Sequence, residues 1–271
     1  MGHETARRRQ ALTGPETTAG AGAQGGPANG GAPAYYAAGR GRLRDMRAVL
    51  HPPYTLWHLS YVVLGGLCGR HVDWGVLGAT LLAFFLAVGV SAHALDELRG
   101  RPLRTELPAG VLVGAGVVGL AGAVALGAVG ILRVGAPLAA FVVVGAVLVL
   151  AYNLELFGGV AHTGLVFALS WGAFPVLTAA YAENRTLPPA ALAIAVFATL
   201  LSAAQRALST PARNLRRRAD AVDGEVRMSD GTVVLLDRPA LLAPLESALR
   251  LLSFAVVAMA VGLVLLRLQI G

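Results

Sequence analysis

Seven separate apolar runs constrain this chain more than any other feature. A transmembrane helix needs about 20 mostly apolar residues, and runs of that kind recur along the sequence. Hydrophobic residues make up 56% of the chain and charged residues only 14%, which indicates an integral membrane protein rather than a soluble one. We therefore predict an all-α, polytopic transmembrane helical bundle with about seven or more spans. The predicted spans are 54–69, 74–96, 109–132, 134–152, 160–181, 188–208 and 248–268.

The arginines predict how the bundle is oriented. If the N-terminus is cytoplasmic, the loops after the second and sixth spans are also cytoplasmic, and they are arginine-rich. The opposite loops hold only Arg70, Arg133 and Arg185. This distribution follows the positive-inside rule for a bacterial-type cytoplasmic membrane and places the C-terminus outside. Because it also accounts for the basic charge, no nucleic-acid partner is inferred.

The chain is predicted to divide into a tail and a membrane domain. Residues 1–45 are rich in Ala, Gly and Arg and lack an apolar block, so we expect a disordered cytoplasmic tail. Residues 46–271 form the transmembrane helical domain, with a cytoplasmic loop near 210–240. Within that loop Val233 to Leu235 predict a small hairpin. Gly110 and Gly114, with later glycines of the third span, predict close helix packing.

The end of the second span carries the first candidate site. His93, Asp96 and Glu97 stand at i, i+3 and i+4, so they share one helix face. Ionisable groups at the edge of a span usually face the bundle interior and mark a substrate, ion or proton site. The alternative is that they only mark the point where the span leaves the membrane.

Two further span ends should lie at the same membrane face, because an even number of crossings separates each from the second span's end. The fourth span ends with Tyr152, Asn153 and Glu155. After the sixth span, Thr210 and Pro211 predict the start of a new helix. Its free N–H groups, with Arg206 and Arg213, would favour an anion such as a diphosphate. For Arg216 to Arg218 the favoured interpretation is contact with lipid headgroups.

The order of these features resembles the UbiA superfamily of intramembrane prenyltransferases. Ala92-His93-x-x-Asp96 followed by Arg101-Pro102-Leu103 stands where the family has its first Asp-rich motif. Tyr152 stands near the end of the fourth span, as the family tyrosine does, and Gly172-Ala-Phe-Pro175 is similar to the element in the fifth span. The sequence departs from the pattern at His93, at Gly100, and in the second motif, which is replaced by Gln205, Ser209 and Arg213.

The resemblance implies a fold, a substrate and a set of site residues. The family holds a prenyl diphosphate through Mg²⁺, whose preferred ligands are carboxylate oxygens. We expect one Mg²⁺ ion here, and the substrates would be an isoprenyl diphosphate and a hydrophobic acceptor. The expected roles are catalysis by Asp96, Glu97 and His93; diphosphate binding by Arg101, Arg206, Arg213 and Ser209; a substrate pocket at Tyr152, Asn153 and Gln205; and metal binding by Asp96, Glu97 and Glu155.

Three functions therefore remain open at the level of sequence. The first is a membrane-embedded UbiA-like transferase, which passes the prenyl group to an aromatic or lipid acceptor or cyclises the prenyl chain. The second is a catalytically silent relative that binds a lipid or a partner protein, which the departures from the motifs favour. The third is a small transporter with His93, Asp96 and Glu97 as a proton relay; transport sites usually lie near the midplane, which counts against it.

Overall fold

The computed structural model describes residues 41–156, 158 and 163–270. In chain order the elements are α1 (Arg42–Val49), α2 (Pro52–Gly66), α3 (Trp74–Phe84), η2 (Phe85–Ala92), α4 (His93–Leu98), α5 (Ala109–Val134), α6 (Leu138–Asn153), α7 (Gly164–Ala168), η4 (Leu169–Ala173), α8 (Phe174–Asn184), α9 (Pro189–Arg217), β1 (Gly224–Arg227), β2 (Val233–Leu236) and α10 (Arg238–Ile270). The π-helical segments η2 and η4 each join two α-helices into one longer helix. The predicted tail up to residue 40 lies outside the described residues, and α1 already begins at Arg42.

Five of the described helices are long and apolar enough to cross a membrane. They are Trp74–Leu98, Ala109–Val134, Gly164–Asn184, Pro189–Arg217 and Arg238–Ile270. Helix α6 is apolar but has 16 residues, and α2 has 15. The prediction of an apolar helical bundle is confirmed, whereas the number of spans, the orientation and the UbiA-like fold stay predictions.

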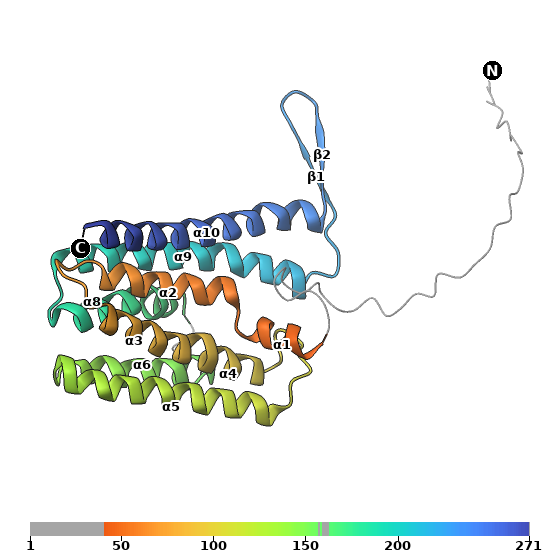
Figure 1. Ribbon diagram of the computed structural model, residues 1–271. Helices are drawn as coiled ribbons and strands as arrows, with labels where there is room; N and C mark the ends of the chain where they lie inside the picture. Colours follow the sequence, from red (N-terminus) through yellow and green to blue (C-terminus); the bar gives the residue numbers. More distant parts are fainter. Residues whose placement is uncertain (1–40, 157, 159–162, 271) are drawn as a thin grey trace, which may run out of the picture. The chain divides into compact units, whose positions relative to one another are not determined.

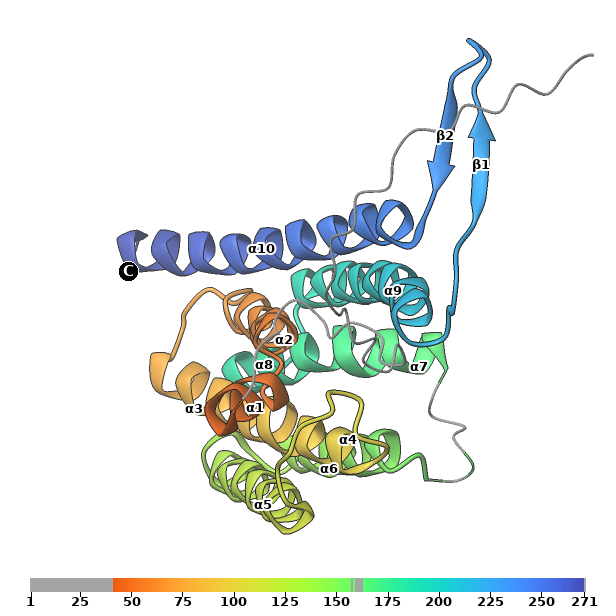
Figure 2. The same cartoon turned by 90° about the vertical axis from the view of Figure 1, so that its right-hand side faces the viewer.

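Successive long helices run in alternating directions, as Figure 1 shows. The ends of α4, α6 and α9 therefore lie at one end of the bundle, together with α1 and the start of α10. Figure 2 looks onto that end, where the loop after α4 lies between α1 and α6. The predicted meeting of three span ends is confirmed in this respect.

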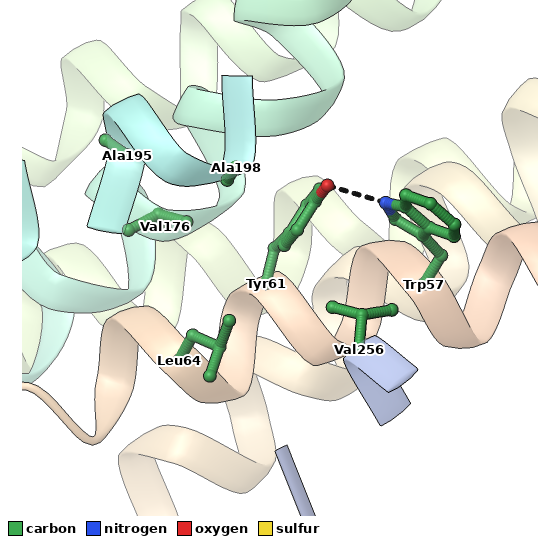
Figure 3. Close-up of a cluster of buried hydrophobic side chains, with 7 residues drawn as sticks. All are labelled: Trp57, Tyr61, Leu64, Val176, Ala195, Ala198 and Val256. Carbon is green, nitrogen blue, oxygen red and sulfur yellow. Dashed lines mark hydrogen bonds between the residues drawn. The ribbon is translucent and has the colours of Figure 1, made fainter. Parts of the chain in front are cut away.

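The largest buried cluster lies between α2, α8, α9 and α10, and Figure 3 shows its side chains. Trp57 is 2% exposed and Tyr61 is 0% exposed. The Trp57 indole N–H donates to the Tyr61 hydroxyl at 2.6 Å, and that hydroxyl lies 3.2 Å from Ser202 Oγ of α9. Polar groups buried among apolar side chains need such partners. The first bond orients the Tyr61 hydroxyl within α2, and the second joins α2 to α9.

Glycines allow close packing at Gly65 of α2 and, as predicted, at later glycines of α5. A Cβ added at Gly65 of α2 would lie 2.2 Å from the Val176 carbonyl oxygen of α8, so only glycine permits this approach. In α5 the buried contact is made at Gly119, where an added Cβ would lie 2.8 Å from the Leu86 carbonyl oxygen. Gly110 and Gly114 have open space beside them. The packing role predicted for that pair is therefore wrong.

Two predicted boundaries near the arginine-rich loop are also corrected. Helix α9 runs through Pro211 to Arg217, so no new helix begins there. Continuing the helix costs Pro211 one backbone hydrogen bond, but the surrounding turns maintain its direction. Helix α10 starts at Arg238, ten residues before the predicted 248. The predicted hairpin is confirmed: β1 and β2 pair antiparallel, with Val226 opposite Val234.

Candidate functional site

Glu97 organises the loop that follows α4. Its side chain is 0% exposed. One carboxylate oxygen accepts from the Leu103 N–H at 2.8 Å; the other accepts from the Thr105 N–H at 2.9 Å and the Thr105 hydroxyl at 2.8 Å. Three donors aimed at one buried carboxylate satisfy its charge within the protein. The structure thus shows that Glu97 positions the loop after α4, which the helix spacing did not reveal.

Asp45 and Arg101 hold the same loop from its two sides. Asp45 of α1 accepts from the Glu106 N–H at 2.9 Å, so the short helix is tied to the loop. Arg101 has a left-handed backbone with φ of 50°. Its guanidinium donates to the Leu107 carbonyl at 2.6 Å. The guanidinium expected to bind diphosphate therefore already serves as a donor inside the loop.

Asp45 is ionised under ordinary conditions because its partners outweigh its burial. Burial opposes the charged form, but hydrogen bonds from Arg44 and the Glu106 N–H, together with the Arg44 charge, lower the pKa of Asp45 below its usual value. A lowered pKa in the folded state stabilises the fold above the unfolded pKa of about 4, and this contribution is lost as the pH falls through the folded pKa.

Asp45→Asn is therefore expected to loosen α1 and the loop at pH 7. Hydrogen–deuterium exchange of the purified protein should show lower protection factors over residues 42–50 and 99–106. The difference from wild type should vanish at a pH below the folded pKa of Asp45. Asp73→Asn, which removes the same charge at the N-cap of α3 at the opposite end of the bundle, is the control and should leave both segments unchanged. Equal protection of wild type and Asp45→Asn at pH 7 would contradict this role.

Three contacts join the ends of α4, α6 and α9. Arg99, just after α4, forms an ion pair with Glu155 at 2.8 Å and also donates to the Leu154 carbonyl. From α9, Arg217 donates to the Pro102 carbonyl at 2.7 Å. These bonds connect the three helix ends that were predicted to meet. One of them pairs the Glu155 carboxylate with Arg99.

Tyr152 and Arg206 form the polar centre of this region. Arg206 donates to the Tyr152 hydroxyl at 3.0 Å, and its guanidinium carbon lies 5.0 Å from the centre of the Phe167 ring. The charges of Arg206, Arg213 and Asp96 all act on the Tyr152 hydroxyl. The structure therefore brings together four residues that the sequence placed in one site: Asp96, Tyr152, Arg206 and Arg213.

The π-helical segments place an aromatic side chain beside this centre. Trp171 lies in η4 and is buried against Val88 and Ala92 of η2. Its ring meets the Tyr152 ring edge-on, with 5.6 Å between ring centres. Single-turn π segments often occur at functional sites because they reorient the side chains that follow. The ring contact with Tyr152 places Trp171 beside the candidate site, where the sequence motifs had not put it.

An apolar cavity of about 160 Å³ reaches the same aromatic ring. It lies between α3, α5, α6 and α8, and its lining runs from Arg133 and Leu138 at one end to Trp171 at the other. Phe84, Phe141 and Phe174 also line it. A cavity of this kind suits an apolar chain rather than a polar molecule.

Two histidines stack where the sequence predicted one catalytic histidine. The rings of His93 and His51 lie 4.6 Å apart with an angle of 28° between them. His51 has a left-handed backbone with φ of 44°, which is rare outside glycine. His58 of α2 contacts the Tyr54 carbonyl through Nδ1 at 2.6 Å. Nothing in the spacing of His51 and His93 indicated their stacking, because it depends on how α4 meets the α1–α2 junction.

The remaining predicted side chains have local partners. Gln205 is 5% exposed and is hydrogen-bonded to Tyr54. Ser209 donates to the Arg206 carbonyl at 3.5 Å, and the Asn153 amide donates to the Val149 carbonyl at 2.8 Å. Gln205 and Ser209 lie on α9 beside Arg206, whereas the Asn153 amide is turned back onto its own helix.

The predicted magnesium ligands do not gather into one set. Glu97 accepts three hydrogen bonds, Glu155 is paired with Arg99, and Asp96 is exposed. No group of three or more His, Cys, Asp or Glu side chains that suits a metal ion occurs among the described residues. Mg²⁺ requires several oxygen ligands in near-octahedral geometry. As arranged, these three carboxylates do not fit that requirement.

Comparison of the chain with protein-family models, with curated proteins and with solved structures found no match. Membership of the UbiA superfamily therefore stays a prediction. The function is inferred below from the arrangement of the side chains.

Proposed function

We propose that this protein is a membrane-embedded UbiA-like transferase acting on an isoprenyl diphosphate. One observation carries the proposal: the apolar cavity ends at Trp171, whose ring touches Tyr152, and Tyr152 is hydrogen-bonded to Arg206. An apolar chamber beside an arginine complements a molecule with an apolar chain and an anionic head. Arg213 adds a second positive charge on the same helix.

In the proposed reaction the allylic C–O bond breaks, and the diphosphate leaves with the electron pair. The guanidinium groups of Arg206 and Arg213 stabilise the charge that develops on the leaving group. The faces of Tyr152 and Trp171 stabilise the allylic cation. A nucleophilic atom of the acceptor then bonds to the allylic carbon and loses its proton; in a cyclisation, a double bond of the same chain takes the acceptor's place.

The magnesium part of the proposal concerns Asp96 alone. When bound, Mg²⁺ would offset diphosphate charge, and Asp96 is the predicted ligand that lies exposed on α4, whereas Glu97 accepts hydrogen bonds within the loop and Glu155 pairs with Arg99. No step above depends on the ion. We also propose a cytoplasmic N-terminus, because the arginine-rich end of the bundle holds the ends of α4 and α9.

The test is release of diphosphate from geranyl, farnesyl and geranylgeranyl diphosphates by the purified protein, with and without magnesium. Turnover with at least one chain length is expected. Asp96→Ala should remove the part of the turnover that depends on magnesium, because Asp96 is the proposed ligand of that ion. Asp220→Ala, an exposed carboxylate outside the site, is the matched control. No release with any chain length would exclude the enzyme, and full turnover in Asp96→Ala would remove that residue's role.

The second candidate, a catalytically silent lipid-binding relative, is favoured by the structural use of Glu97 and Glu155. It predicts binding of a prenyl diphosphate without diphosphate release. Equilibrium binding measured beside the release assay separates the two functions.

A further inference from the structure

The hairpin of β1 and β2 has more apolar surface than a solvated hairpin needs. It projects away from the helices in both Figure 1 and Figure 2. Five of its apolar side chains are between 42% and 74% exposed: Val226, Met228, Val233, Val234 and Leu235. An isolated two-stranded hairpin is only marginally stable in water, and further strands stabilise it. These features favour pairing of the hairpin with further strands in a larger sheet.

The outer edge of β1 has no backbone partner among the described residues. The Met228 N–H donates to the Thr232 carbonyl at 2.8 Å, which fixes the phase of the ladder. Hydrogen-bonded and non-bonded pairs alternate along an antiparallel ladder, so Val226 faces Val234 in a bonded pair. The N–H and C=O groups of Glu225 and Arg227 therefore point to the outer edge. An unpaired edge of this kind is a template for another strand.

The side chains of β1 are complementary to those of a second β1. In an antiparallel pair centred on Val226, Glu225 lies opposite Arg227 of the second copy, and Arg227 lies opposite its Glu225. These are the residues whose backbone groups face the edge, so the charge pairing and the hydrogen bonding select one register. Opposite charges directly across strands stabilise a sheet, and like charges destabilise it. Within one chain the two side chains already attract each other, at 2.9 Å.

The direction of the hairpin suits two copies in one membrane. Such copies are related by an axis along the membrane normal, and the two-fold axis of an antiparallel strand pair stands perpendicular to the sheet. In Figure 1 the strands run across the direction of the helices. Figure 2, which sees α5 and α9 nearly end-on, shows the hairpin face-on. The two-fold axis of the strand pair therefore lies along the helices, as does the axis that relates two copies in one membrane.

We propose that β1 pairs with β1 of a second copy of this chain, centred on Val226, and so makes a four-stranded sheet with order β2-β1-β1-β2. The paired strands bury little surface, so the association is weak in dilute detergent and is promoted where the membrane concentrates the copies. The proposal is independent of the transferase function.

The test is a charge exchange in the full-length protein, measured by energy transfer between two dye-labelled populations in liposomes. Glu225→Arg alone and Arg227→Glu alone place like charges at both cross-strand positions, and each should weaken self-association by about tenfold. A mixture of the two variants restores both opposite-charge pairs, and energy transfer between them should return to the wild-type level. The in-chain pair is lost in both variants, so only pairing between chains explains such a return.

Asp223→Arg makes the same change of charge outside β1 and should leave energy transfer unchanged. Absence of energy transfer in wild type overturns the proposal. It is also overturned if either single variant associates as well as wild type, or if the mixture stays as weak as the separate variants. The mixture can regain energy transfer only if both variants still form their hairpins. A return to the wild-type level therefore shows that neither substitution acts by unfolding the hairpin, and no return counts against the proposed register.

Discussion

Replacing Arg206 with Met is expected to lower the affinity for farnesyl diphosphate by about 10- to 100-fold. A hydrogen bond to a charged group contributes about 1.5–3 kcal/mol, and each 1.4 kcal/mol is a factor of ten in the dissociation constant. Methionine keeps an apolar side chain but removes the guanidinium, which donates to Tyr152 and lies over the Phe167 ring. The substitution therefore tests the charge rather than the packing.

Binding of farnesyl diphosphate to the protein in nanodiscs, followed by calorimetry, measures this effect. Arg218→Met is the matched control, because Arg218 is an exposed arginine at the end of the same helix. Farnesol, which lacks the diphosphate, should bind wild type and Arg206→Met alike. Equal affinity of Arg206→Met and Arg218→Met for farnesyl diphosphate would show that the headgroup binds elsewhere, and the proposed site would be abandoned.

Replacing Glu97 with Ala is expected to destabilise the fold by about 3–5 kcal/mol. The substitution leaves the Leu103 N–H and both donors of Thr105 buried without their acceptor. Each buried donor left unsatisfied costs about 1–3 kcal/mol, and partial entry of water reduces the sum. The apparent melting temperature should fall by several degrees, and proteolysis within residues 99–108 should accelerate.

Glu97→Gln separates this structural role from a role in metal binding. Glutamine keeps one carbonyl oxygen as acceptor, so the loss of stability should be smaller than in Glu97→Ala. Glu106→Ala changes an exposed carboxylate of the same loop and should leave stability unchanged. If Glu97→Ala melted like wild type while losing all magnesium response, the carboxylate would be a metal ligand and its contacts in the loop would be incidental.

The local features of this protein were predictable from short stretches of sequence. The apolar runs placed the long helices to within a few residues, except that α9 continues to Arg217, past the predicted end at 208, and α10 begins before the predicted 248. The short apolar run from Val233 to Leu235, with its flanking turn residues, identified the β1–β2 hairpin. The parity of the crossings correctly placed the ends of α4, α6 and α9 at one end of the bundle. All of these depend on residues near one another in the chain or on the count of helices.

Two predictions whose outcome depended on residues distant in sequence were wrong. Pro211 and Thr210 have the composition of a helix start, yet α9 continues through them because the preceding turns already set its course. Gly110 and Gly114 have the spacing of a packing motif, but a Cβ added at either would meet no atom of the described residues within 4 Å. Propensity gave the wrong answer in both cases because tertiary context determines which local option is used.

The sequence by itself determined that the chain is an apolar helical bundle with its charges at the helix ends. The cause is the cost of moving polar groups out of water, which is summed along contiguous residues and so can be read from them. Only the tertiary structure decided that Glu97 holds a loop, that His93 stacks on His51, and that Arg206 reaches Tyr152. Hydrogen bonds and ring contacts act over a few ångströms, and those distances are set by how the helices pack against one another.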